Sequence, residues 1–463
     1  MISAIALDLG TTSIKAGLLD HAGALSNIVA LPAPSLVVDG GRYESDALAY
    51  AETAEQVLGA CLAQAGSAPP LGLCSQRSSF LIWDRASGQP LTPLISWQDN
   101  RGAASCEALR DSENLIRDFT GLRLTPYYFA PKLRVVLQDH PEWRKRLERG
   151  ELLAGTLDTF LIWRWTGGQH HVTDASMAAR TLLMDIRQRQ WSPALCDLFA
   201  IPLSMLPRIE PSAGLNLNLR NGLDLQASLG DQSAALIAST ADGSTEALVN
   251  LGTGGFVIRY LAEGEFTRDG YLRTLVWQDS KLHYHLAIEG TLNSIAAALA
   301  PYPAGECRVQ YLAAEDIYCL AEPSGLGAPY FRNDIALRFS QPVERLAPRQ
   351  IAVLLLEGII FRVARILEEF HHQHALERVY LSGGLSELAC LQQGVAQCVP
   401  FEVYRLLQKE SSLQGAALLA AGMAPACHRE AEKVAVVRTD NSLPEKYLRW
   451  KDWFDALLNA RTA

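Results

Sequence analysis

The stretch "AIALDLGTTSIKAGLLD", residues 4–20, gives the strongest indication of the fold. An apolar run ends at one acid, Asp8, which is followed by a glycine and three hydroxyl side chains before the chain becomes apolar again. This pattern is typical of two strands joined by a tight turn. The chemistry of the turn is unusual, because a hairpin needs no acid and no cluster of hydroxyls.

The turn has the composition of a phosphate cradle. Backbone N–H groups around a glycine can close on a phosphate, since glycine has no side chain to block it. Asp8 would repel a phosphate, but it can hold a hydrated magnesium ion that binds one. The alternative is a plain hairpin whose polar side chains face water. The candidate phosphate contacts are Gly10, Thr11, Thr12, Ser13 and Lys15.

Length and composition indicate a globular protein of two domains. The chain has 463 residues, of which 49% are hydrophobic and 20% charged. The net charge of −9 argues against a nucleic-acid partner, and no apolar run is long enough to span a membrane. The start reads as a strand and not as a signal peptide, so we expect a cytoplasmic protein. Nine cysteines, an odd number without CxxC spacing, favour reduced thiols over a disulfide framework or a zinc site.

Strand-like and helix-like segments alternate, which predicts an α/β fold. We expect helices over 47–65, 152–165 and 350–370, and a strand over 80–84. A second strand–turn–strand pattern, "EALVNLGTGGFVIRYL", occupies residues 246–261.

The recurrence of this pattern suggests two similar halves. A third glycine pair follows a strand in "VYLSGGLSE", residues 379–387. The polar segment 239–246 is the expected boundary, which gives domains 1–242 and 243–463.

Asp231 is the candidate general base. It lies in "SLGDQSAALIA", after a glycine and before an apolar run with the character of a helix. One interpretation is an acid that takes a proton from a substrate hydroxyl. The other is a helix cap, a common use of aspartate worth about 1 kcal/mol. The residues alone do not separate the two.

The ordered set of motifs resembles the FGGY carbohydrate kinases, and among them most closely the glycerol kinases. It consists of "DLGTTSIKAGLLD", "SQRSSFLIWDRASGQPL", "ISWQDNR", "GTLDTFLIWRWTGGQHHVTDASMAARTLL", "GDQSAAL", "NLGTGGF", "GLGAPY" and "SGGLS". The resemblance covers residues 4–422. It implies two domains of the actin and hexokinase type, each with a ribonuclease-H-like core, with ATP and magnesium between them.

The resemblance also implies roles for single residues. Asp8 would orient magnesium through water, while the first turn faces the γ-phosphate. Asp231 would be the catalytic base. The second phosphate motif would be Gly252, Thr253 and Gly254, and the pair that packs on adenosine would be Gly383 and Gly384. Ser386 and Glu387 stand where the family often has an asparagine that contacts adenine.

The sugar or polyol site implied by the resemblance departs from the glycerol kinases. Ser78 replaces a glutamate that accepts hydrogen bonds from glycerol. Phe129 and Val135 replace a serine and a tryptophan, and Leu337 and Gln341 replace two glycines. The implied substrate contacts are Gln76, Arg77, Ser78, Tyr127 and Gln232.

These observations favour an ATP-dependent kinase that acts on a hydroxyl of a small polyol or ketose, working alone or as a homodimer. The alternatives are a glycerol kinase proper and a catalytically inactive sugar-binding or regulatory relative. Retention of Asp8, Thr253 and Asp231 argues against an inactive protein. A chaperone or filament protein of the actin superfamily is a third alternative, disfavoured by the sugar-kinase segments "WQDNR" and "TDAS".

Overall fold

The computed structural model describes residues 2–243, 245–262, 265, 270–332, 334–437 and 442–460. The chain forms two compact units, each built from three stretches. Unit 1 holds the residues up to Ala238 together with Arg273–Leu286 and Glu410–His428. Unit 2 holds Ser239–Leu272, Ala287–Lys409 and the described residues from Arg429 onward. The division expected from the sequence is a single cut, whereas two later stretches return to unit 1.

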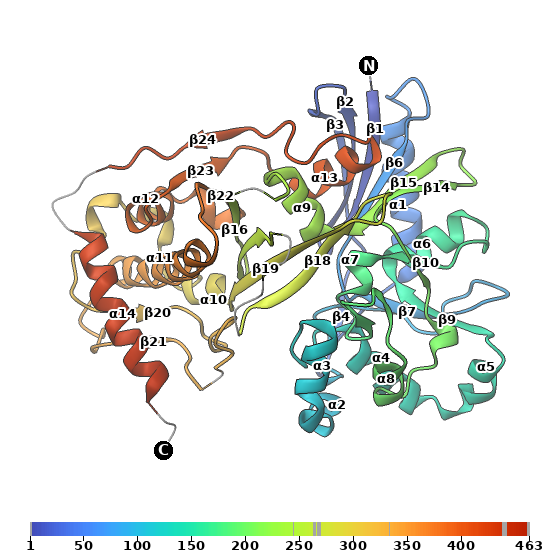
Figure 1. The fold of residues 1–463 in the computed structure, drawn as a ribbon, viewed down its shortest axis with the longest axis horizontal. Coiled ribbons are helices and arrows are strands. Elements are labelled where there is room, and N and C mark those ends of the chain that lie inside the picture. The colour runs from blue at the N-terminus through green and yellow to red at the C-terminus, as the bar shows by residue number, and fades with distance from the viewer. Residues whose placement is uncertain are drawn as a thin grey trace. The chain divides into compact units, whose positions relative to one another are not determined.

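Unit 1 is organised around a six-stranded sheet in the order β14-β15-β6-β1-β2-β3 (Figure 1). β1 and β2 form the expected antiparallel hairpin, and β1, β6 and β15 run parallel. The apolar runs of these strands are buried, as expected for a sheet covered on its faces. Its strands are β1 Ile2–Leu9, β2 Ser13–Asp20, β3 Leu25–Pro32, β6 Leu71–Ser75, β14 Ala213–Asn218 and β15 Asp224–Gly230.

A second sheet of unit 1 has five strands in the order β4-β5-β8-β7-β9. These are β4 Val37–Asp39, β5 Arg42–Ser45, β8 Leu94–Ile95, β7 Phe80–Asp84 and β9 Leu152–Thr156. Short strands complete the unit: β10 Val172–Asp174, β11 Met184–Asp185, β12 Gln190–Trp191 and β13 Arg208–Glu210. Its helices are α1 Ala47–Leu62, α2 Ala103–Ala108, α3 Glu113–Thr120, α4 Phe129–Asp139, α5 Arg144–Glu148, α6 Leu157–Trp165, α7 Ala175–Ala178, α8 Pro193–Leu198, α9 Asp231–Ser239 and α13 Ser411–Ala420.

The helix expected over 152–165 is wrong in its first five residues. Leu152–Thr156 is strand β9, which pairs antiparallel with β7, and the helix begins only at Leu157. A continuous apolar run carries no periodicity that distinguishes a buried strand from a buried helix. Pairing with β7, a long-range contact, decides the outcome.

Helix α13 shows why a late stretch belongs to unit 1. A Cβ on Gly72 of β6 would lie 2.2 Å from the Ala416 carbonyl oxygen of α13. A Cβ on Gly415 would lie 1.8 Å from the Ala234 carbonyl oxygen of α9. Only glycine permits these approaches, so α13 lies directly against the sheet and α9.

Unit 2 repeats the strand order of unit 1 in β19-β17-β16-β22-β23-β24. These strands belong to a seven-stranded sheet whose remaining strand, β18, lies almost wholly in the Arg273–Leu286 stretch of unit 1. β16 is antiparallel to β17 and parallel to β22, as β1 is to β2 and β6. The expectation of two similar halves is therefore confirmed in the strand order. The strands are β16 Glu246–Leu251, β17 Gly255–Tyr260, β18 Leu272–Gln278, β19 Tyr284–Leu292, β22 Arg378–Ser382, β23 Glu402–Leu406 and β24 Ala431–Lys433, with β20 Cys319–Leu320 and β21 Arg338–Phe339 as a separate pair.

The core of unit 2 surrounds α11, a long helix over Pro348–Gln373 that contains the predicted 350–370 segment. Its other helices are α10 Ile295–Leu299, α12 Ala389–Cys398 and α14 Leu443–Asn459, with 3₁₀ turns η4 Ala304–Glu306, η5 Val309–Tyr311 and η6 Gly384–Glu387. Over the described residues, no helix combines the length and apolar character needed to cross a membrane.

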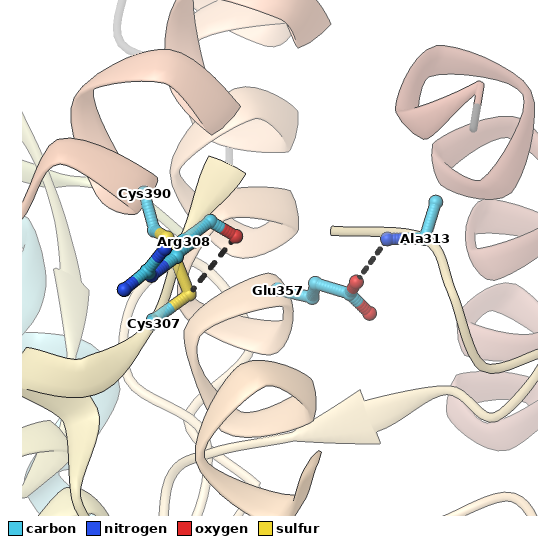
Figure 2. The surroundings of a disulfide bond; sticks show 5 residues. All are labelled: Cys307, Arg308, Ala313, Glu357 and Cys390. Atoms are coloured by element: carbon cyan, nitrogen blue, oxygen red, sulfur yellow. Dashed lines mark hydrogen bonds between the residues drawn. A yellow bond between two sulfur atoms is a disulfide. The ribbon is translucent and has the colours of Figure 1, made fainter. Parts of the chain in front are cut away.

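The expectation of reduced thiols throughout is wrong for one pair. Cys307 and Cys390 form a disulfide in unit 2, shown in Figure 2. They lie 83 residues apart, so no local spacing in the sequence indicated the bond. The other seven cysteines carry free thiols.

Candidate functional site

Three strand ends bring the unit 1 candidates to one edge of the sheet. The registers place Ser75 of β6 opposite Leu9 of β1 and Gly230 of β15. Because the three strands are parallel, the residues that follow them emerge at the same edge. Gln76 and Asp231 are two of these residues. The open carboxyl edge of such a sheet is a common position for a ligand site.

Asp8 lies one residue before the end of β1 and is half-buried. Its Oδ1 atom is buried and has no hydrogen-bond partner among the described residues. Burial, together with the charge of Asp231, raises the pKa of Asp8 to about 7. A divalent cation would relieve both the missing partner and the like charge, so this carboxylate fits a magnesium ion.

No group of three or more histidine, cysteine or acidic side chains within the described chain has the geometry to hold a metal ion. Magnesium commonly keeps several of its waters and takes only one or two carboxylates. A single carboxylate acting through water therefore remains compatible with the structure.

Asp231 is the first residue of α9, as the sequence predicts. Its Oδ1 accepts a hydrogen bond from the Gln232 amide at 2.7 Å and lies 3.6 Å from Nε of Arg77. Burial raises the pKa of Asp231, while Arg77, the Gln232 amide and Arg180 act in the opposite direction. The carboxylate is thus held beside a buried guanidinium and retains basic character.

Gln76 links the first glycine turn to two other segments. Its Nε2 donates to the Tyr50 hydroxyl at 3.2 Å, and its Oε1 accepts from Ser79 at 2.8 Å and Thr11 at 3.3 Å. The Trp97 indole in turn donates to the Thr11 hydroxyl at 3.0 Å. Gln76 and Thr11 therefore share a buried network that fixes the turn.

Ser78 has an unusual backbone conformation beside Arg77. Its φ of 63° lies in the left-handed region, which a residue other than glycine enters at a cost. Lys132, fully buried, donates to the carbonyls of Ser78 and Ser96 at 3.0 and 2.9 Å. The Ser78 hydroxyl donates to the Arg180 carbonyl at 3.2 Å. These contacts hold the segment after β6 in a single arrangement.

The other residues of the first turn have separate roles. A Cβ on Gly10 would lie 2.6 Å from the Ser13 carbonyl oxygen, which explains the glycine. Thr12 is exposed, and its carbonyl accepts from the Ala33 amide at 3.0 Å. Lys15, opposite Asp8 in the hairpin, forms an ion pair with Glu410 at 2.7 Å.

Tyr127 is partly buried, with its ring centroid 5.6 Å from that of Trp97 and 5.1 Å from that of Tyr128. The aromatic contact with Trp97 connects Tyr127 to the network around Gln76. Gln232 follows Asp231 in the first turn of α9.

The turn between β16 and β17 of unit 2 is open. The Gly252 amide donates to the Gly254 carbonyl at 2.8 Å, and a Cβ on Gly252 would meet nothing within 4 Å. The Thr253 side chain is exposed, while its carbonyl accepts from Ala296 of α10 at 3.2 Å. A ligand can approach this backbone closely.

The glycine pair after β22 borders a cavity of about 300 Å³. Gly383 has a φ of 86°, and a Cβ there would lie 2.4 Å from the Leu251 carbonyl oxygen, whereas Gly384 faces open space. Ser386 donates to the Gly383 carbonyl at 2.7 Å. The cavity is lined by Ser382, Gly383, Gly384, Ser386, Glu387, Leu406, Gln408 and Lys409.

Sequence reasoning missed three charged residues of the unit 1 site. Glu410 comes from a distant stretch and pairs with Lys15, and the charge of Arg180 acts on Asp231. Lys132 supports Ser78. Arg180 lies in the quoted motif that ends in "AARTLL", and Lys132 lies between Phe129 and Val135, two positions compared above with the glycerol kinases; these were the available signals.

Comparison with known proteins agrees with this geometry. The family model described as the FGGY family of carbohydrate kinases, N-terminal domain, matches residues 3–245, and its C-terminal counterpart matches 247–424. An apulose kinase of Pectobacterium atrosepticum is 32% identical over 96% of both chains. A glycerol kinase of Cereibacter sphaeroides is 32% identical over 96% of this chain and 97% of its own.

Solved structures share the fold. The glycerol kinase of Plasmodium falciparum with ADP superposes with a TM-score of 0.86 at 22% identity, covering 99% of both chains. A xylulose kinase of Brucella ovis superposes with a TM-score of 0.83 at 20% identity, covering 98% of this chain and 99% of its own. The protein belongs to the FGGY family of carbohydrate kinases and is an ATP-dependent enzyme of that family.

Proposed function

We propose that the enzyme phosphorylates a hydroxyl of a small polyol or ketose, with Asp231 as the general base. The observation that carries the proposal is the Asp231 carboxylate at the carboxyl edge of the unit 1 sheet, 3.6 Å from the buried Arg77 guanidinium and with a raised pKa. A raised pKa makes the Asp231 carboxylate a stronger proton acceptor than an ordinary aspartate. The family assignment supports the reaction class.

In this proposal, each unit supplies its own residues. Asp231 takes the proton of the attacking hydroxyl, and Arg77 and Gln232 orient the substrate beside it. The first turn, the Gly252–Gly254 turn and the Gly383–Gly384 pair bind the nucleotide through their backbone amides. Positioning and charge stabilisation provide most of the rate enhancement in phosphoryl transfer, so these residues need no covalent chemistry.

Asp8 would hold magnesium through water. The cation, when bound, neutralises charge on the phosphates. The unpartnered Oδ1 of Asp8 supports this assignment. The ion pair of Lys15 with Glu410 leaves Lys15 beside Asp8 as a local counter-charge.

The substrate is proposed to have four or five carbons. Ser78 offers a short neutral acceptor where glycerol kinases have a carboxylate, and its hydroxyl proton is already donated to the Arg180 carbonyl. Hydrogen bonds to charged groups contribute about 1.5–3 kcal/mol, so glycerol would lose roughly tenfold or more in affinity. Relatives at the same identity are named as apulose and glycerol kinases, so both substrate sizes occur among them.

A coupled ADP-release screen tests the proposal. It compares kcat/KM for glycerol, tetritols, pentitols, ketopentoses and apulose at fixed ATP and magnesium. We expect a four- or five-carbon compound to exceed glycerol by about tenfold, and Ser78→Glu to shift preference towards glycerol. Glycerol as the best substrate would refute the size argument and identify a glycerol kinase proper. Binding without turnover of any compound would identify an inactive sugar-binding relative.

The cytoplasmic location remains a prediction, and the choice between a monomer and a homodimer remains open. Light scattering of the purified chain measures the oligomeric state directly.

A further inference from the structure

The Cys307–Cys390 disulfide of unit 2 is shown in Figure 2. Each of the two segments that it joins is connected to a proposed nucleotide motif. Cys390 lies in the first turn of α12 and is 1% exposed, whereas Cys307 follows η4 and is half-buried. Their Cα atoms are 6.2 Å apart.

The helix that contains Cys390 lies next to the proposed adenosine motif. Helix α12 begins just after η6, which contains Gly384 and Ser386. The Gln392 side chain of α12 donates to the Ser386 carbonyl at 2.7 Å. Ser386 and Gly384 both line the cavity of about 300 Å³.

The Cys307 side leads to the second phosphate turn. Helix α10 precedes η4, and its residue Ala296 donates to the Thr253 carbonyl at 3.2 Å. The disulfide therefore restrains the segment between α10 and η5 against the helix that supports the adenosine motif.

We propose that Cys307 and Cys390 form a reversible thiol–disulfide modification site whose oxidation tightens nucleotide binding by unit 2. The coupling rests on the proposed function, which assigns the Gly252–Gly254 turn and the Gly383–Gly384 pair to the nucleotide. A restrained segment loses less freedom when a ligand binds, so the oxidised form binds more tightly.

A small thiol reagent supplies the two electrons that reduce the disulfide. Its thiolate attacks the half-buried Sγ of Cys307, and the Cys390 sulfur leaves as a thiolate and takes a proton. A second reagent thiolate then releases Cys307, which also takes a proton. The reagent becomes a disulfide and the protein gains two electrons and two protons. Oxidised glutathione drives the reverse reaction.

The structure holds the oxidised state, and the surroundings of the two sulfur atoms also suit thiols. A reduced Cys307 thiol has the Arg308 carbonyl as an acceptor 3.9 Å from Sγ. Cys390 lies in the apolar core of unit 2, where a thiol packs as a small hydrophobic group.

The first experiment follows the bond itself and does not depend on kinase activity. The full-length protein is equilibrated with reduced dithiothreitol or with oxidised glutathione, alkylated and mapped by mass spectrometry. We expect the Cys307–Cys390 peptide pair only after oxidation, and an unfolding temperature on the order of 5–10 °C higher in that state. A bond that resists reduction in the folded protein, or thiols that stay reduced in oxidised glutathione, overturns the proposal.

The second experiment measures the coupling by calorimetric titration with ADP in both states. We expect a Kd about 3–10-fold lower after oxidation. Cys307→Ser and Cys390→Ala should each abolish the redox dependence, while Cys427→Ser, at an exposed thiol of unit 1, should preserve it. Equal ADP affinity in the two states of the wild type, with the bond formed, overturns the coupling. Loss of ADP binding in both states would refute the nucleotide assignment of the proposed function.

Discussion

The two glycine turns occupy the same place in two sheets of the same strand order but differ in charge. "DLGTTS" begins in the last two residues of β1, with Asp8 two residues before the glycine. "NLGTGG" begins in the last two residues of β16, with Asn250 at that position. Lys15, Glu410 and Asp231 complete a charged cluster in unit 1. The unit 2 turn offers only backbone and one exposed hydroxyl. Under the proposed function, the repeated fold would thus provide a phosphate cradle twice, and metal and proton chemistry once.

The largest expected effect comes from Asp231, which tests whether proton chemistry belongs to unit 1. Asp231→Asn keeps the size of the side chain but removes the base, so kcat on the best substrate should fall about 100-fold or more. Steady-state kinetics measure this, and nucleotide affinity should be unchanged. Asp46→Asn at the start of α1 is the matched control, because Asp46 accepts hydrogen bonds from the Leu48 and Ala49 amides as a helix cap.

Asparagine caps a helix about as well as aspartate. If Asp231 only caps α9, the Asp231→Asn and Asp46→Asn variants will be equally active. The two units would then not differ in proton chemistry.

The next prediction makes the first turn resemble the second. Asp8→Asn gives unit 1 the residue that stands at position 250 of unit 2. The magnesium concentration for half-maximal rate should rise about 10–100-fold, the range seen when groups around a metal are removed. An unchanged magnesium titration would exclude Asp8 as the metal group. Loss of the folded circular dichroism spectrum would instead assign it a structural role.

Two glycine-to-alanine substitutions distinguish a glycine that leaves room for a ligand from a glycine that the turn itself requires. At Gly252 a Cβ meets nothing in the protein, so Gly252→Ala should leave the unfolding temperature unchanged and raise KM for ATP about tenfold. At Gly10 the same change meets the Ser13 carbonyl oxygen at 2.6 Å and should destabilise unit 1 by about 1–3 kcal/mol. Calorimetry and kinetics on both variants give the comparison. An unaltered KM in the Gly252 variant would make the second turn an ordinary hairpin.

The sequence indicated the strands, helices and turns of the site more completely than the long-range contacts that hold them in place. Local patterns sufficed for the two hairpins, the α9 start at Asp231 and the long helix α11, because apolar periodicity and glycine turns are written in consecutive residues. The ion pair of Lys15 with Glu410 joins residues 395 apart, and the Cys307–Cys390 bond spans 83. Such contacts depend on the tertiary arrangement, and a single sequence read by itself carries no local sign of them. The strand β9 was missed for the same reason.

The two units also differ in how each one pairs a buried lysine. Lys446 of unit 2 is paired with the carboxylate of Glu357. Lys132 of unit 1 donates to two backbone carbonyls, and the charged groups that act on it are Asp99 and Arg101. Burial lowers the pKa of Lys132 to about 7 from its ordinary 10.5. The Lys132 arrangement leaves a lysine whose charge changes near neutral pH.

The smallest effect is therefore a pH dependence of stability. Between pH 7 and 10.5 the unfolded chain binds a proton at Lys132 that the folded protein does not, so the contribution of Lys132 to stability rises with pH across that window and is least below pH 7. Urea midpoints at pH 7, 8 and 9 measure it. The free energy of unfolding of the wild type, relative to that of Lys132→Met, should rise with pH by up to about 1.4 kcal/mol per pH unit.

Lys433→Met is the control, because the exposed Lys433 has a raised pKa and stays protonated in the folded and unfolded states between pH 7 and 9. A difference that is flat with pH would mean that Lys132 stays charged in the folded protein, held by Asp99, and would remove this contrast between the two units.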